Sequence, residues 1–234
     1  MGEAVFEMPV LGAVGPAQSE ELVHFTSRGR EPGPGVPPDI RAMTASERLD
    51  SILRGEVLRS SQPYGAERAC LCFSESPPDH LAHLIADRQF EPYGIVVTRE
   101  GVLDAGGGAV AYVPEDTYSL FRAAGLEHWA VRTGTDSTWM HEREWRVPVP
   151  DGPQTVGMQL GSLRAVLVGD PAWRPSRIGT GTWIHMQEGT PCHGCGDPFC
   201  EEYTVLPRLW LESEIWVWDE AARGVTRYPP GTLT

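Results

Sequence analysis

Two glutamates flank an arginine in the stretch Trp139-Met-His-Glu-Arg-Glu-Trp-Arg146. Side chains at positions i and i+2 of an extended strand share a face. A strand over residues 141–149 would therefore place Glu142, Glu144 and Arg146 on one face. Two neighbouring carboxylates raise each other's proton affinity and can hold a substrate cation or hydroxyl. A solvated edge strand with alternating charges explains the same pattern.

Two upstream segments carry further polar groups at the ends of expected strands. His24 and Thr26 share a face of a strand expected over 21–27, where an imidazole can donate to a ribose hydroxyl and a hydroxyl can support a planar amide. Ser74 follows a strand expected over 69–73 and precedes a Ser-Pro-Pro turn, where side chains reach a cleft. The ordinary alternatives are a hydrogen-bonded structural histidine and a turn cap.

In this order, His24-Phe-Thr-Ser27, Phe73-Ser-Glu75 and Glu142-Arg-Glu144 resemble the motifs of ADP-ribosyltransferases. The helix expected around Leu49-Asp-Ser-Ile-Leu-Arg-Gly55 looks like the Ile-Leu-x-Gly helix of DarT-type toxins and RNA 2′-phosphotransferases. The combination of His-Phe-Thr, Cys-Phe-Ser-Glu, Tyr-Gly-Ile and Glu-Arg-Glu-Trp-Arg is similar to AbiGi-like proteins associated with abortive phage infection. The resemblance covers residues 21–170.

This resemblance implies an α+β fold, namely a split β-sandwich with peripheral helices that holds NAD in a cleft. It implies an NAD-dependent ADP-ribosyltransferase that displaces nicotinamide through an oxocarbenium-like transition state. Glu144 would stabilise the developing positive charge and Glu142 would orient the acceptor, or the two roles are exchanged. Glu-x-Glu accompanies an opening arginine in arginine-type enzymes, whereas this chain opens with His24. The acceptor is therefore left open among protein, nucleic acid and small molecule.

The resemblance also implies which residues bind NAD. His24 would hold the adenosine ribose beside Thr26, and Ser74 would brace the nicotinamide end or the catalytic carboxylate. Tyr93 or Tyr112 is a candidate to stack on nicotinamide, with core packing as the alternative. Arg68 and Arg146 are the candidates for the pyrophosphate, with a surface role as the alternative.

The C-terminal part contains the cysteine cluster Cys192-His-Gly-Cys195-Gly-Asp-Pro-Phe-Cys200. A Cys-x-x-Cys turn is typical of structural zinc sites. Cys200 would be a third ligand and His185 or His193 the fourth. The alternative is a glycine-rich surface turn with reduced thiols.

Composition narrows the function further. The formal net charge of −13 disfavours strong nonspecific binding to nucleic acid. All 19 basic residues are arginine, so the lysine-dependent chemistry of pyridoxal-phosphate enzymes, P-loop NTPases and protein kinases is excluded. The five cysteines favour a reducing cytoplasm over a disulfide framework. We expect no membrane span and no signal peptide.

We expect an N-terminal arm over 1–20, a domain over 21–170 that the resemblance identifies as ADP-ribosyltransferase-like, and a C-terminal extension over 171–234 packed on the same domain. Thr44 and Glu47 form a capping-box signature for a helix. Further helices are expected over 79–87 and 117–124, and strands over 93–98, 109–113, 163–168 and around Trp216 and Trp218. Two other functions fit the sequence: a noncatalytic binding or regulatory module on the same fold, and a zinc-stabilised interaction protein.

Overall fold

The structure is a computed structural model, and it describes residues 17–29, 36–135, 139–149, 155–158, 160–187, 189–192 and 199–234. Its centre is an eight-stranded sheet in the order β15-β14-β10-β4-β1-β3-β8-β5. The strands of this sheet are β1 (Glu21–Phe25), β3 (Cys70–Glu75), β4 (Gly94–Thr98), β5 (Gly108–Ala109), β8 (Glu144–Pro148), β10 (Leu163–Val168), β14 (Glu214–Asp219) and β15 (Gly224–Tyr228). Only the β10–β14 pair is parallel among these described neighbours.

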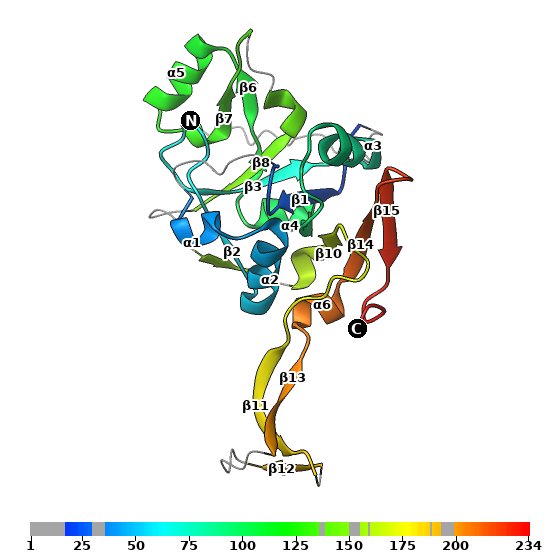
Figure 1. The fold of residues 1–234 in the computed structure, drawn as a ribbon. Coiled ribbons are helices and arrows are strands. Elements are labelled where there is room, and N and C mark those ends of the chain that lie inside the picture. Colours follow the sequence, from blue (N-terminus) through cyan, green and yellow to red (C-terminus); the bar gives the residue numbers. More distant parts are fainter. Residues whose placement is uncertain are drawn as a thin grey trace, which may run out of the picture.

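Smaller elements surround this sheet (Figure 1). The remaining strands are β2 (Val57–Arg59) paired with β9 (Thr155–Gly157), β6 (Ala111–Val113) paired with β7 (Ala130–Arg132), and β11 (Ile178–His185) between β12 (Thr190–Cys192) and β13 (Cys200–Val205). The α-helices are α1 (Pro38–Arg41), α2 (Ala45–Gly55), α3 (Pro78–Ala82), α4 (Arg99–Asp104), α5 (Glu115–Ala123) and α6 (Arg208–Glu212). A π-helix, η1 (His83–Asp87), continues α3, and the 3₁₀ turns are η2 (Glu127–Trp129), η3 (Trp139–Glu142) and η4 (Leu160–Ser162). The mixed α+β class expected from the sequence is confirmed.

The two faces of the sheet bury two separate apolar clusters because successive residues of a strand point to opposite sides. Ile95 and Val97 of β4 pack into a cluster with residues of α2, α4 and α6. Val96, between them, packs into a second cluster with Leu81 of α3 and Ile85 of η1. Helices therefore cover both faces, and the buried strands carry the β-branched residues that such positions favour.

The helix predicted from the capping signature is confirmed as α2. The Thr44 hydroxyl accepts from the backbone N–H of Glu47 at 3.2 Å, and the Glu47 carboxylate accepts from the backbone N–H of Thr44 at 2.7 Å. Leu49 and Leu53, one turn apart, are fully buried against the sheet. The cap thus fixes where this helix begins, a few residues after the end of α1.

The strand expected over 141–149 is shorter than its sequence pattern suggested. Glu142 ends the 3₁₀ turn η3, and strand β8 starts only at Glu144. Arg143, between them, has a left-handed φ of 44°, which breaks the two-residue alternation. The prediction that Glu142 shares a strand face with Glu144 is therefore wrong, whereas Glu144 and Arg146 do lie on one face of β8.

The C-terminal part contributes both to the body and to a projection from it. Strands β14 and β15 extend the main sheet, with Trp216 and Trp218 alternating as expected. Strands β11 and β13 run away from the body as a long arm with β12 at its tip (Figure 1). Among the described residues, no helix is long and apolar enough to cross a membrane.

Candidate functional site

The candidate site lies where strands β1 and β3 stop pairing. Their ladder consists of Leu22 opposite Glu75 and Val23 opposite Ser74. Beyond Val23, β1 continues to pair with β4, and β3 continues to pair with β8. We call this place the ladder opening. The backbone groups that would have joined β1 to β3 here need other partners.

His24 supplies one of those partners. Its Nδ1 donates to the carbonyl oxygen of Cys72 at 2.8 Å, and its ring packs on Phe73. Burial lowers the pKa of His24, the Cys72 carbonyl partly offsets this effect, and the charge of Arg28 lowers the pKa further. The imidazole is thus neutral at pH 7 with its proton on Nδ1, which leaves Nε2 as an acceptor. The only N–H of this neutral ring is therefore used within the protein, and it is not available to donate to a ribose hydroxyl as expected from the sequence.

Glu144 starts β8 on the other side of β3, directly opposite Ser74 in the register. Its carboxylate accepts two hydrogen bonds from Arg146, from Nε at 3.1 Å and from Nη2 at 2.9 Å. The side chains of Glu144 and Arg146 are 8% and 2% exposed. Burial opposes ionisation of Glu144, but the charge and hydrogen bonds of Arg146, aided by Arg28, hold its pKa below the usual value. The carboxylate is therefore ionised at neutral pH.

Arg146 cannot serve as the pyrophosphate ligand considered from the sequence. Besides Glu144, its guanidinium donates from Nη1 to the carbonyl oxygens of His128 at 2.9 Å and Ala130 at 3.4 Å. A buried guanidinium with these partners is a fixed structural support. Its effect on the site is to fix the position and charge of Glu144.

Arg28 is the functional candidate that sequence reasoning missed. Its Nη1 lies 2.6 Å from Oε2 of Glu142, and its side chain is 32% exposed. The charges of Glu142 and Glu144 outweigh the effect of burial and raise the pKa of Arg28. Gly29 follows with φ +63°, and an added Cβ there would lie 1.9 Å from the carbonyl oxygen of Gln89. That glycine, five residues after the first residue of the His-Phe-Thr motif, was the available signal for a tight turn that directs Arg28 toward Glu142.

Two further side chains complete the surroundings of Glu144. The Tyr112 hydroxyl accepts from the backbone N–H of Glu144 at 2.8 Å, and burial raises the pKa of Tyr112 to about 12. Burial, and then the charge of Glu144, raise the pKa of the Cys72 thiol, which hydrogen-bonds to the Glu144 carboxylate. We refer to Arg28, Cys72, Tyr112, Glu142, Glu144 and Arg146 together as the Glu144 cluster.

The other residues suggested as NAD ligands lie outside this cluster. The Thr26 hydroxyl donates to the carbonyl oxygens of Ala45 at 2.8 Å and Tyr93 at 3.0 Å, which ties β1 to α2 and β4. Tyr93 itself packs edge-on against Trp173, as the core alternative anticipated. Arg68 is exposed and precedes β3, at the end of that strand opposite to Ser74. The structure thus places His24, Ser74 and Glu144 on three adjacent strands, with the charge of Arg28 acting on both His24 and Glu144. Thr26, Tyr93 and Arg68 lie elsewhere.

The expected zinc ligands lie at the tip of the arm. Cys192 and Cys200 face each other with their sulfur atoms 3.2 Å apart, and His185 pairs with Cys200 in the β11–β13 register. Cys195 and His193 lie outside the described residues. Within the described part of the chain, no group of three or more His, Cys, Asp or Glu side chains is placed to hold a metal ion.

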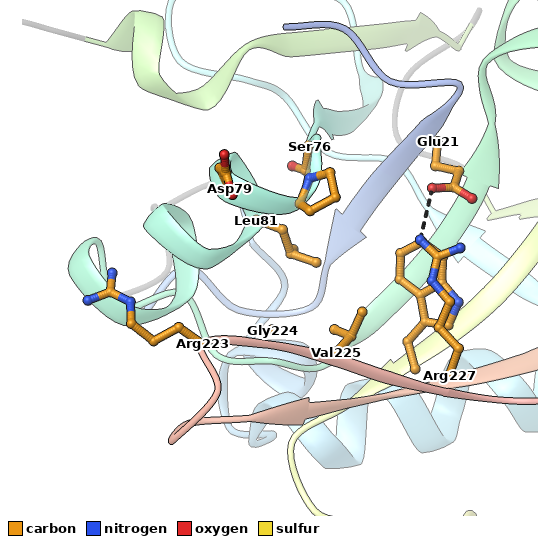
Figure 2. Close-up of a pocket in the computed structure, with 10 residues that line it drawn as sticks. Glu21, Ser76, Asp79, Leu81, Arg223, Gly224, Val225 and Arg227 are labelled. Atoms are coloured by element: carbon orange, nitrogen blue, oxygen red, sulfur yellow. Dashed lines mark ion pairs between the residues drawn. The ribbon is translucent and has the colours of Figure 1, made fainter. Parts of the chain in front are cut away.

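A small pocket lies elsewhere, between α3 and the β14–β15 hairpin (Figure 2). The arginines of this pocket are already engaged: Arg227 pairs with Glu21 at 3.6 Å and lies over the Trp216 ring at 4.1 Å, and Arg223 pairs with Asp87 at 2.7 Å. None of its described lining residues belongs to the Glu144 cluster. The pocket and the Glu144 cluster therefore lie in different places.

Comparison of the chain with protein-family models, with curated proteins and with solved structures found no match.

Proposed function

We propose that the chain is an NAD-dependent ADP-ribosyltransferase that acts through Glu144. One observation carries the proposal: His24, Ser74 and Glu144 lie on the three adjacent strands β1, β3 and β8 at the ladder opening, with Glu144 kept ionised by Arg146. This is the order of motifs by which the sequence resembles that family. In the proposal, the separation of β1 from β3 corresponds to the division of a split β-sandwich, and NAD enters there.

The proposed placement of NAD uses groups of the site that can still bind a ligand. Nε2 of His24 accepts a hydrogen bond from a ribose hydroxyl, since Nδ1 already donates to the Cys72 carbonyl. Ser74 lies directly across from Glu144 and braces the nicotinamide end. Arg28 replaces Arg68 and Arg146 as the partner of the pyrophosphate, because its side chain is one-third exposed and its guanidinium binds Glu142 through a single nitrogen in the contact described.

The proposed reaction is a substitution at C1′ of the nicotinamide ribose. The C1′–N bond breaks, and its electron pair leaves on the nicotinamide nitrogen, which neutralises the pyridinium. The ionised Glu144 stabilises the positive charge that develops on the sugar, and it needs no reorganisation to do so because Arg146 already holds it. The acceptor then forms a bond to C1′ and passes its proton to Glu142.

The test is to incubate the purified chain with NAD and to follow nicotinamide release by chromatography. Glu144→Gln should reduce release by about 10²-fold or more, the usual loss when a preorganised charge-stabilising group is removed. Glu142→Gln should retain release, with water as the acceptor, while transfer to any other acceptor falls. Release that survives in folded Glu144→Gln protein would overturn the proposal.

A second function is favoured by a specific observation. Glu142 and Glu144 both sit in ion pairs with arginines of the same chain, at 2.6 Å and 2.9 Å. A noncatalytic module that binds NAD or a partner would have the same internally neutralised cluster. Such a module would bind NAD in calorimetry without releasing nicotinamide, and Glu144→Gln would leave its biological effect intact.

A further inference from the structure

The arm formed by β11, β12 and β13 has no hydrophobic core of its own. None of the described residues from Arg177 to Val205 is buried, and Trp183, Met186, Phe199 and Tyr203 are exposed. A small sheet without a buried face is marginally stable in water. Small structures of this kind are usually held by a disulfide or a metal ion. The arm therefore needs a covalent or coordinate link near its tip.

The register of the arm places two cysteines and one histidine on the same face. Cys192 pairs with Trp183 on one side of β11, and Cys200 pairs with His185 on the other side. Residues directly opposite each other in antiparallel strands point to the same face, and Trp183 and His185 are two residues apart on β11. Both thiols and the His185 imidazole thus face one side of the small sheet.

The contact between the two thiols requires the small sheet to curl. In a flat three-stranded sheet the two edge strands are about 10 Å apart. The sulfur atoms of Cys192 and Cys200 nevertheless lie 3.2 Å apart, across β11. Gly189, with φ +65°, turns the chain between β11 and β12, and its N–H donates to the His185 carbonyl at 2.7 Å. Both strand pairings of β11 thus end close to the contact between the two sulfur atoms.

We propose that Cys192 and Cys200 are two thiolate ligands of a structural zinc ion that holds the tip of the arm. Tetrahedral zinc with bonds of about 2.3 Å keeps two sulfur ligands about 3.8 Å apart, whereas a disulfide requires about 2.05 Å. The distance of 3.2 Å is nearer to the first geometry. Cys192 and Cys200 are not joined as a disulfide, and in reducing surroundings a metal ion is the commoner link.

Zinc binding here is coupled to the order of the arm. Each thiol loses a proton to solvent when it binds the ion, so no oxidant is needed and the exchange is one zinc ion for two protons. His185 lies on the same face of the small sheet as both thiols, and a neutral imidazole is a suitable zinc ligand. The arm lies away from strand β8, which carries Glu144 (Figure 1), so its zinc supports an extended surface and not the proposed reaction.

The full-length protein tests this directly with Zn²⁺ and Co²⁺ alone. After incubation with Zn²⁺ and gel filtration, the wild-type chain should retain one equivalent, and Cys192→Ser and Cys200→Ser should each lose most of it. Substitution with Co²⁺ should give a sulfur-to-cobalt charge-transfer band that both variants lack. Cys70→Ala is the matched control: it removes a free thiol in β3 and should leave metal content and band unchanged.

Three results would overturn the proposal. They are a wild-type chain that retains no zinc, a cobalt band that persists in Cys200→Ser, and a thiol titration of freshly purified protein that shows Cys192 and Cys200 joined as a disulfide. Limited proteolysis gives an independent readout, since zinc should protect the arm against cleavage in the wild type and not in the variants. Cleavage at the same rate with and without zinc would contradict the structural role.

Discussion

Two buried carboxylates lie next to each other on β3 and β8, on opposite faces of the sheet, and both are bound by arginine. Glu144 is held by Arg146 within the Glu144 cluster. Glu75 lies 2.6 Å from Arg99 and 3.5 Å from Arg143. It also accepts from the backbone N–H of Ser19 at 3.0 Å and from the Trp145 indole at 3.3 Å. We call these last five residues the Glu75 cluster.

The two clusters differ in what their carboxylates hold. A carboxylate has about four positions at which it can accept a hydrogen bond. The four groups around Glu75 come from β8 and the residue before it, from the first residue of α4 and from the N-terminal segment, so Glu75 ties separate parts of the chain together. Glu144 receives its two strong hydrogen bonds from one residue of its own strand. Glu75 therefore organises the fold, whereas Glu144 is itself held in place beside the ladder opening.

Glu75→Gln should have the largest effect on stability. It leaves Arg99, 16% exposed, and Arg143 without their counter-charge, and the loss of one partner of a buried ion pair costs about 3–5 kcal/mol. Urea unfolding should show this decrease, while nicotinamide release per folded molecule stays at the wild-type value. Glu144→Gln is expected to lose NAD cleavage. The same loss in folded Glu75→Gln protein would show that the two clusters do not differ in function.

Removing the Glu144–Arg146 pair as a whole should separate stability from activity. Glu144→Leu alone leaves Arg146, 2% exposed, as an unpaired buried charge and should strongly destabilise the chain. The double variant Glu144→Leu/Arg146→Met replaces both charges by apolar groups, and it should regain about 1–4 kcal/mol relative to that single variant. It should still release no nicotinamide. A double variant that cleaves NAD would show that Glu144 is only a structural residue.

Local sequence signals predicted much of this fold. The capping box gave the start of α2, and the apolar runs gave β4, β10 and β14. These features depend on neighbours in sequence, which periodicity and cap chemistry describe. The exception is β8, where the left-handed φ of Arg143 separates Glu142 from the strand. Nothing in the alternation of charges distinguishes a strand from a 3₁₀ turn followed by one.

The candidate site was predicted in part, because its residues come together through long-range pairing. The motifs placed His24, Ser74 and Glu144 on separate strands, and the sheet makes those strands neighbours. Arg28 was missed because its position depends on how the chain turns at Gly29 against Gln89, sixty residues further on in sequence. Thr26 was assigned to NAD because a hydroxyl beside a histidine has no visible partner in the sequence; in the structure it binds two carbonyl groups.

The pH dependence of stability should show that the fold keeps His80, which the charge of Arg143 in the Glu75 cluster affects, in its neutral form. Burial, and then the charges of Arg143, His83 and His141, lower the pKa of His80 to about 4 from 6.5. The unfolded chain therefore binds more protons between these values, so the stability from neutral His80 is complete above pH 6.5 and is lost as the pH falls toward 4. His80→Gln should flatten the fall in unfolding free energy between pH 7 and 5 by about 1 kcal/mol, allowing for solvent screening.

Thr44→Ala is the control for that experiment. It removes the α2 cap and should lower stability by about 1 kcal/mol throughout the range from pH 7 to 5, because no titrating imidazole is involved and Glu47, whose pKa Thr44 lowers, stays ionised there. The unfolding free energy of Thr44→Ala should run parallel to that of the wild type as the pH changes. The same parallel course for His80→Gln would show that the fold does not hold His80 neutral. His24 and His128, whose pKa values are also lowered by burial, should preserve part of the pH dependence in His80→Gln.

The smallest effect on nicotinamide release should come from Cys72→Ala. The Cys72 thiol has no counterpart among the groups that surround Glu75. Its pKa is raised by burial and by Glu144, so it stays protonated at pH 7 and donates to that carboxylate. A thiol is a weak donor, and Cys72→Ala should reduce nicotinamide release by about twofold, equivalent to about 0.5 kcal/mol. Cys70→Ala, two residues away on the same strand, should leave the rate unchanged. A loss in Cys72→Ala as large as that in Glu144→Gln would mean that the thiol, and not Arg146, determines where the carboxylate lies.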